Sequence, residues 1–137
     1  MKLNHIGFAV RDLERAIQFF KEKFGIEATH RETGGGFLIG FLETGGTPIE
    51  LLQDVTPGGL MTKFIEKRGE GVHHISFEVD DIRSALKTMQ AQGVTCIDKE
   101  PRGGTRHCLM AFLHPKDTFG VLTELVEFPE KHNKERE

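Results

Sequence analysis

Two histidines and two glutamates have the types and positions expected of metal ligands: His5, Glu50, His74 and Glu124. Imidazole nitrogens and carboxylate oxygens bind divalent first-row metals, and water can complete the coordination shell. Both glutamates stand among apolar neighbours, in IELL and LTELVE, where an unpaired charge is costly. These residues therefore indicate a site for one divalent metal ion, and their types suit Co, Ni, Mn and Zn alike.

The four residues belong to a repeat whose two copies are offset by 69 residues at their start. NHIGFAVRDLERAIQFF in the first copy matches HHISFEVDDIRSALKTM in the second, so that His5 corresponds to His74. PIELLQ and LTELVE likewise place Glu50 opposite Glu124 in the repeat. If the two copies pack about a pseudo-twofold axis, one histidine and one glutamate from each can converge on a shared site.

Each copy is typical of a βαβββ module. The apolar period changes from two to about 3.6 residues within each matched segment, which predicts a strand leading into a helix. Asp12 and Asp81 are placed as N-caps, and Gly25 and Gly93 as helix ends. Turn residues delimit six further predicted strands: Ala28–Glu32, Phe37–Leu42, Pro48–Gln53, Thr95–Asp98, His107–Leu113 and Val121–Glu127.

These modules predict one domain at residues 1–128. The modules span about 1–56 and 70–128, and each is too short to bury a core alone. The linker at 57–69 should hold a short helix at Met61–Lys67, and residues 129–137 form a charged tail.

The adjacent histidines at 73 and 74 point to opposite faces of their strand. Bulky apolar residues alternate with small or polar ones, and the bulky face should pack under the module's own helix. His74 lies on the other face with Ser76 and Glu78, as a residue lining a cavity would, so His73 is predicted to be structural or solvent-facing. Three histidines lack a repeat partner and are assigned to the surface or to loops: His30, His107 and His132.

Composition indicates a soluble globular protein. The chain has 137 residues, a net charge of −3 and a pI of about 6.2, which argue against a nucleic-acid partner because phosphates require a basic face. No apolar stretch is long enough to span a membrane, and the N-terminus lacks a signal-peptide pattern. Cys96 and Cys108 are expected to be reduced, buried thiols in a cytoplasmic protein.

Several segments resemble the vicinal oxygen chelate superfamily, which includes glyoxalase I, bleomycin resistance proteins and dioxygenases. They are HIGFAVRDLERAIQFF, IELL, KFIEKRGEGVHHISFEVDDI, DKEPR and AFLHPKDTFGVLTELVE, and the resemblance covers about residues 3 to 128. KRGEGVHHI and the last segment are more similar to methylmalonyl-CoA epimerases than to glyoxalase I. The resemblance implies a glyoxalase-like α+β fold, in which both modules form one eight-stranded, cupped mixed sheet around the metal site.

The resemblance also implies an isomerase that interconverts (R)- and (S)-methylmalonyl-CoA, with an acyl-CoA substrate and a homodimeric assembly. The metal, on His5, Glu50, His74 and Glu124, would stabilise the enolate formed when the C2 proton is removed. The family's acidic turn residue before the third strand is missing in HRETGGGFLIG. Glu32 is the candidate for one proton-transfer role, and Glu50 or Glu124 for the other.

The CoA phosphates need cations at the rim of the site, and Arg102, Arg106 and Lys116 lie in suitable predicted loops. His114, in HPKD, either contacts the substrate or serves the turn.

Three other functions stay open at this point. A glyoxalase I-like lactoylglutathione lyase would use a similar metal site and would depend on a thiol. A ring-cleaving dioxygenase would consume oxygen, but such enzymes usually have longer chains. A non-enzymatic ligand-binding protein of the same fold tends to lack the ligand residues.

Overall fold

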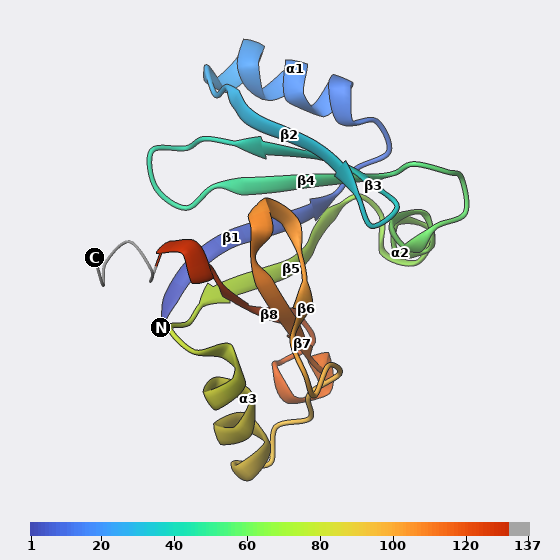
Figure 1. The fold of residues 1–137 in the computed structure, drawn as a ribbon. Helices are drawn as coiled ribbons and strands as arrows, with labels where there is room; N and C mark the ends of the chain where they lie inside the picture. The colour runs from blue at the N-terminus through green and yellow to red at the C-terminus, as the bar shows by residue number, and fades with distance from the viewer. Residues whose placement is uncertain (132–137) are drawn as a thin grey trace. The chain divides into compact units, whose positions relative to one another are not determined.

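The computed structural model describes residues 1–131 (Figure 1). Its elements follow one another as β1 (Lys2–Ala9), α1 (Leu13–Phe24), β2 (Ala28–Gly34), β3 (Phe37–Leu42), β4 (Ile49–Asp54), α2 (Leu60–Arg68), β5 (Gly71–Glu78), α3 (Ile82–Ala91), β6 (Arg102–Gly103), η1 (Thr105–His107), β7 (Leu109–Leu113), η2 (Pro115–Asp117) and β8 (Leu122–Glu127).

Within the described residues, eight strands form one mixed sheet in the order β2-β3-β4-β1-β5-β8-β7-β6. β1 and β4 are parallel, as are β5 and β8, whereas β3 and β7 pair with their neighbours in antiparallel fashion. The predicted α+β class with an eight-stranded mixed sheet is therefore confirmed.

The chain divides into two compact units, His5–His73 (the first unit) and Met1–Asn4 with the residues from His74 onward (the second unit). Cooperative folding of residues 1–128 as one domain stays a prediction.

The helices of the two repeated strand-to-helix segments begin and end where the sequence predicts. The Asp12 and Asp81 carboxylates each accept a hydrogen bond from the backbone N–H three residues later, at 3.1 Å, and so cap α1 and α3. Gly25, with φ of 67°, ends α1 in the left-handed conformation, and Gly93, with φ of 84°, follows α3.

In the first unit, α1 covers one face of the sheet (Figure 1). Leu13 and Ile17 pack there with Val10, Leu42 and Leu51. The approach is close at Gly40, where an added Cβ would lie 3.0 Å from Cδ1 of Ile17. A larger residue at position 40 would therefore push α1 away from the sheet.

The opposite face of the first unit carries α2, which packs through Met61 and Ile65. The predicted helix Met61–Lys67 is confirmed, with one more residue at each end. Asp54 caps this helix, because its carboxylate accepts hydrogen bonds from the backbone of Met61 and Thr62 and from the Thr62 hydroxyl, at 3.1, 2.7 and 2.6 Å. Burial raises the pKa of the Asp54 carboxyl, but these hydrogen bonds outweigh it and hold the pKa below its usual value.

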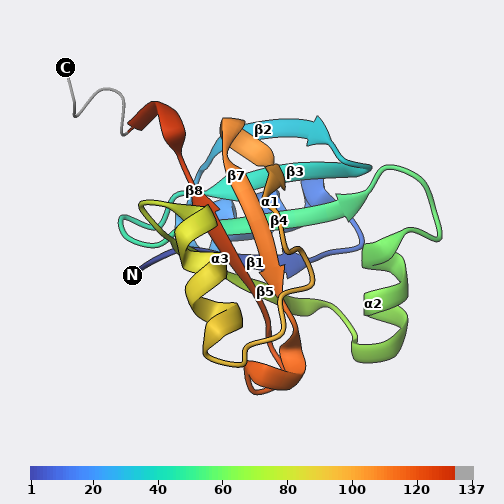
Figure 2. The ribbon, with the colours of Figure 1, turned by 60° about the horizontal axis from the view of Figure 1, so that its bottom comes forward.

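In the second unit, α3 lies along β7 and β8 (Figure 2). The prediction of a strand at Thr95–Asp98 is wrong, since only an isolated bridge from Cys96 to Leu113 occurs there. The Asp98 carboxylate accepts a hydrogen bond from the Phe112 N–H at 2.9 Å and thus takes the place of a backbone partner. The strand on the outer side of β7 is instead the two-residue β6. β7 begins two residues later than predicted because His107, with φ of 57°, belongs to η1.

Cys96 and Cys108 are buried and are not joined by a disulfide bond. Burial raises the pKa of the Cys96 thiol, against an opposing effect of the Lys99 charge. No helix among residues 1–131 is long and apolar enough to cross a membrane. Most of the predicted tail at 129–137, His132 included, lies outside the described residues.

Candidate functional site

His5 and Glu50 form the predicted ligand pair of the first unit. Gly7 in β1 is in register with Glu50 in β4, which places the glutamate beside the strand that carries His5. The two residues are 3% and 4% exposed, and His5 Nε2 lies 3.8 Å from Glu50 Oε1. Phe41, opposite Glu50 in β3, packs edge-on against the His5 ring, with centroids 6.1 Å apart.

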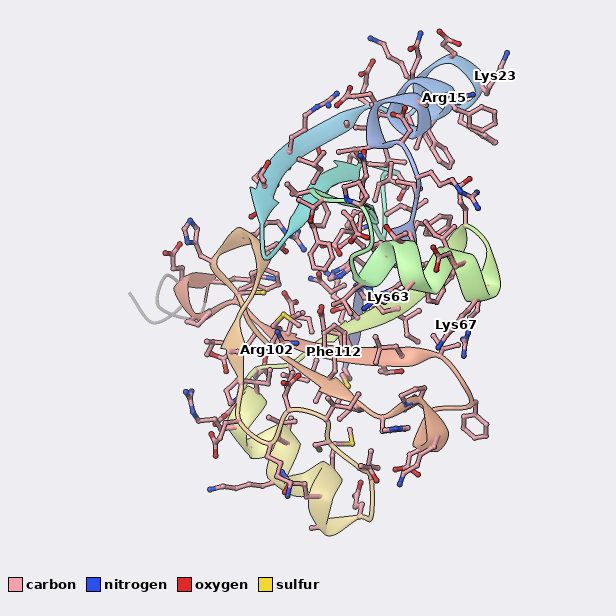
Figure 3. The ribbon with its side chains drawn as sticks, turned by 90° about the vertical axis from the view of Figure 1, so that its right-hand side faces the viewer. Arg15, Lys23, Lys63, Lys67, Arg102 and Phe112 are labelled. Carbon is pink, nitrogen blue, oxygen red and sulfur yellow. The ribbon has the colours of Figure 1, made fainter. Side chains whose placement is uncertain are left out.

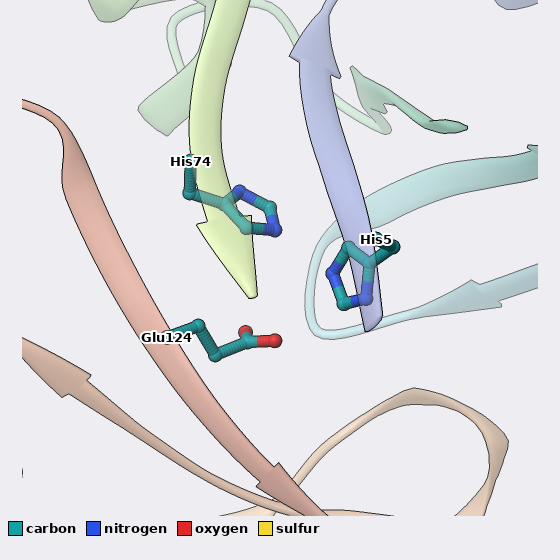
Figure 4. Close-up of side chains that lie close together, drawn as sticks. All are labelled: His5, His74 and Glu124. Carbon is teal, nitrogen blue, oxygen red and sulfur yellow. The ribbon is translucent and has the colours of Figure 1, made fainter. Parts of the chain in front are cut away.

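His74 and Glu124 form the corresponding pair of the second unit, on β5 and β8 (Figure 4). They are 3% and 5% exposed. Ser76 and Phe112 are both in register with Glu124. The Ser76 hydroxyl donates a hydrogen bond of 2.8 Å to Glu124 Oε1, and Phe112 packs edge-on against His74 at 5.9 Å. His74 therefore lies on the same face of β5 as Ser76, which is the face predicted from the sequence.

His73 points to the other side of β5. Its ring packs against Phe64 of α2, with centroids 5.0 Å apart, as a structural residue would. The sequence prediction for the adjacent histidines at 73 and 74 therefore agrees with the contacts that each one makes.

Glu32 lies within β2, on the face that also carries Glu50. The register runs from His30 in β2 to Phe41 in β3 and on to Glu50 in β4, and Glu32 is two residues along β2. His30 Nε2 lies 3.0 Å from Glu32 Oε1, and the His30 ring packs on Phe41 at 5.8 Å. His30 is at the surface as predicted, but it belongs to a strand rather than a loop.

The two predicted arginines each have a partner within the second unit. Arg102 Nε donates to the Asp98 carboxylate at 3.1 Å, and its guanidinium lies 5.7 Å from the centre of the Phe112 ring (Figure 3). Arg106 adopts a left-handed backbone conformation, with φ of 54°, and its Nη2 donates to Asn4 Oδ1 at 3.0 Å. Both guanidinium groups are therefore oriented by neighbouring side chains.

His114 has a turn role. Its Nδ1 accepts a hydrogen bond from the backbone N–H of Lys116 at 3.0 Å and so caps η2. The Lys116 side chain is exposed.

The first unit also contains a cavity of about 400 Å³ between the end of β4 and α2. Arg11, Asp54, Met61 and Glu66 are among its lining residues. None of the four predicted metal ligands lines it, so this cavity does not mark the candidate metal site.

Sequence reasoning missed the rings and the hydroxyl that pack on the candidate ligands. Phe41 and Phe112 occupy like places in GFL and AFL, each preceded by a small residue. That second repeat was the available signal, but an apolar residue in a strand is ordinarily assigned to the core. The Ser76 hydrogen bond requires the parallel register of β5 and β8, which the sequence does not specify.

Several proteins are similar to this chain. The ethylmalonyl-CoA/methylmalonyl-CoA epimerase of Cereibacter sphaeroides is 37% identical over 128 residues, which cover 90% of this chain and 96% of that protein. The mitochondrial methylmalonyl-CoA epimerase of Dictyostelium discoideum is 36% identical over 129 residues, covering 92% and 78%. A probable lactoylglutathione lyase of Vibrio cholerae is 26% identical over 136 residues, covering 96% and 94%.

A solved structure of a Streptomyces coelicolor methylmalonyl-CoA epimerase variant, in complex with 2-nitronate-propionyl-CoA, superposes with a TM-score of 0.86. It is 36% identical, and the match covers 93% of this chain and 94% of that one. The model of the Glyoxalase/Bleomycin resistance protein/Dioxygenase superfamily matches residues 4–112. These matches confirm the resemblance found in the sequence: the chain belongs to the glyoxalase/bleomycin resistance protein/dioxygenase superfamily.

Proposed function

We propose that this chain is a metal-dependent epimerase that interconverts (R)- and (S)-methylmalonyl-CoA. Its similarity to named epimerases, over most of both chains, supports an isomerase acting on an acyl-CoA. One observation carries the metal requirement. Among the described residues, His5, His74 and Glu124 each offer one ligand atom, and these atoms lie within 4.8 Å of one another.

The donor set fits a divalent ion. Two imidazoles and a carboxylate, all buried, suit Zn, Co, Ni or Mn. Ligand atoms bound at about 2.0 to 2.2 Å from one ion lie roughly 3 to 4 Å apart. Glu50, 3.8 Å from His5, is the fourth ligand in this proposal.

The reaction begins with removal of the weakly acidic C2 proton, which requires stabilisation of the developing enolate oxygen. A bound divalent cation would supply this as a Lewis acid on the thioester carbonyl and would orient the substrate. Phe41 and Phe112 restrict rotation of the His5 and His74 rings. The Ser76 hydroxyl holds the Glu124 carboxylate in one orientation.

Inversion at C2 requires two proton-transfer groups on opposite faces of the carbon. Glu32 is proposed for one face, because it shares a sheet face with Glu50 and is only partly exposed. Glu124 or Glu50 is proposed for the other, and it would have to leave the ion to act.

The CoA phosphates are assigned to Arg102, Arg106 and Lys116, with His114 beside them. The Arg102 side chain is 58% exposed, and its Nε hydrogen bond to Asp98 uses one of the five guanidinium donors. We further expect a cytoplasmic homodimer, which sedimentation would test.

The alternative is a glyoxalase I-like lactoylglutathione lyase. The Vibrio cholerae relative supports it, at 26% identity against 37% for the epimerase of Cereibacter sphaeroides. Turnover that depends on glutathione would favour this alternative.

The deciding experiment follows proton–deuterium exchange at C2 of methylmalonyl-CoA by NMR, with metal-reconstituted protein. Exchange and epimerisation are expected with metal and not after chelation. Absence of both in the metal-loaded protein would reject this substrate.

A further inference from the structure

His30 and Glu32 form a polar pair on the solvent side of the candidate site. They are successive residues on one face of β2, and His30 Nε2 lies 3.0 Å from Glu32 Oε1. Their side chains are 46% and 28% exposed. The carboxylate is thus the more enclosed member of the pair, and the imidazole is in contact with water.

Phe41 connects this pair to the candidate metal ligands. Its ring contacts His30 on one side, at 5.8 Å, and His5 on the other, at 6.1 Å. All these residues belong to the first unit, and the strand register places His30, Phe41 and Glu50 in one row across the sheet. The row runs from an exposed imidazole to a buried carboxylate, with an aromatic ring between them that separates the water-accessible end from the buried end.

We propose that His30 is a relay residue that carries the proton from Glu32 to solvent. The inference rests on the proposed function. In the forward step the C2–H bond breaks, its electron pair moves toward the thioester carbonyl, and Glu32 takes the proton. Glu32 then gives that proton to His30 Nε2, the imidazolium loses a proton from Nδ1 to water, and exchange with water restores the tautomer.

The residue types suit this sequence of transfers. Imidazole is the side chain whose unperturbed pKa lies nearest neutrality, so it gains and loses protons readily under physiological conditions. Without the relay, a proton on the partly enclosed Glu32 would leave more slowly or would return to C2. The contact between His30 and Glu32 is partly exposed to solvent, and exposed contacts between such groups contribute little to stability, so its loss should affect proton transfer more than folding.

The test uses His30→Gln in the metal-loaded, full-length chain. The glutamine amide can still donate a hydrogen bond to Glu32 but cannot carry a proton. The quantity to measure in D₂O is the amount of deuterium that enters unepimerised substrate for each epimerisation event. We expect this ratio to fall by about tenfold in His30→Gln. That effect is smaller than the 10²- to 10⁴-fold rate loss typical of a missing general base. Metal content should equal that of the wild type.

Imidazole rescue provides a second readout. In His30→Ala, added imidazole should restore exchange in a concentration-dependent way, because the vacated site is open to water. Arg31→Gln is the matched control: Arg31 lies between the two residues, faces the other side of β2 and pairs with Glu14 of α1. Its deuterium ratio should equal the wild-type ratio.

Two outcomes overturn the relay. An unchanged deuterium ratio in His30→Gln would do so, as would a loss of exchange in His30→Ala that imidazole does not restore. Both require an active wild type, so they are distinct from failure of the proposed function, in which the wild type itself shows no exchange.

Discussion

The two units hold their candidate carboxylates by different means. In the second unit, Ser76 stands in register with Glu124 and donates a hydrogen bond to it. The repeat places Gly7 at the same position of the first unit, in register with Glu50, and glycine has no side chain to donate. Glu50 instead lies 3.8 Å from His5. The two units therefore differ in the residue that stands in register with each candidate carboxylate, a serine in one and a glycine in the other.

The units differ again at their outer strands. β2 has seven residues and presents His30 and Glu32, whereas β6 has two and is followed by η1, which carries Arg106. A long strand positions side chains through its ladder of hydrogen bonds, whereas Arg102 of the short strand is oriented by its hydrogen bond to the Asp98 carboxylate. Under the proposed function, the first unit would supply carboxylate and imidazole for proton transfer, and the second would supply cations for the phosphates.

The largest expected effect comes from removing a ligand that the repeat shares. Protein purified without chelator should contain about one divalent ion per chain, and His74→Ala should contain almost none, because ligand loss lowers affinity steeply. His5→Ala should behave in the same way. Elemental analysis measures both, with His73→Ala as the control that keeps its metal. Metal loss in His73→Ala rather than His74→Ala would reverse the assignment of faces on β5.

A substitution at Glu32 tests the role proposed for the outer strand of the first unit, β2. Glu32→Gln should slow C2 exchange by at least about 10²-fold, the lower end for a lost general base. Metal content should not change. The comparison variant is Glu27→Gln, whose carboxylate is exposed and pairs with Lys21. Full activity in Glu32→Gln would transfer the base role to Glu50 or Glu124.

Ser76 tests how Glu124 is held. Ser76→Ala removes the hydrogen bond to the carboxylate and should weaken metal binding by about tenfold or more, as is typical for groups that orient a ligand. Titration of the metal-free protein with Zn²⁺ measures this. Thr123→Val, a buried change on the opposite face of β8, should leave the affinity as it is. Equal affinities in Ser76→Ala and wild type would mean that Glu124 needs no such support.

The smallest expected effect concerns α2, which follows the strands of the first unit. Asp54→Ala should lower the free energy of unfolding by about 1 to 2 kcal/mol at neutral pH, the range for a lost helix cap. The folded-state pKa of Asp54 is lowered, so its contribution is present above the usual value of 3.8 and is lost as the pH falls through the folded-state value. Urea unfolding of wild type and variant should therefore converge in acid, and a constant difference would exclude the charge as the cause.

The sequence predicted the candidate ligands because two independent patterns agree on them. The period of two places His74 and Ser76 on one face of β5, and the repeat then transfers that assignment to His5. The same alternation places Glu124 in a buried row. Local periodicity is thus sufficient to assign a residue to one face of its strand wherever that strand has one apolar face.

The outer strand of the second unit could not be predicted in this way. Thr95–Asp98 has strand-like residues, but the Asp98 side chain takes the hydrogen bond that a strand backbone would have made. The sequence did not predict the pairing of His30 with Glu32 for a similar reason: His30 has no repeat partner, and its proposed role depends on a side-chain contact. A side chain that takes the hydrogen bond of a backbone group leaves no periodic pattern in the sequence.

The contrast between β2 and β6 also bears on solubility, since these two strands are the ends of the sheet order. An end strand offers unpaired backbone groups to other chains, and exposed, long, apolar ones promote aggregation. β6 is too short to serve as a template, and its Arg102 is charged. β2 is long, but His30, Arg31 and Glu32 place polar or charged groups along it. Replacing these residues with apolar ones would remove a barrier to intermolecular strand addition, so the residues proposed to move protons also help to keep the protein dispersed.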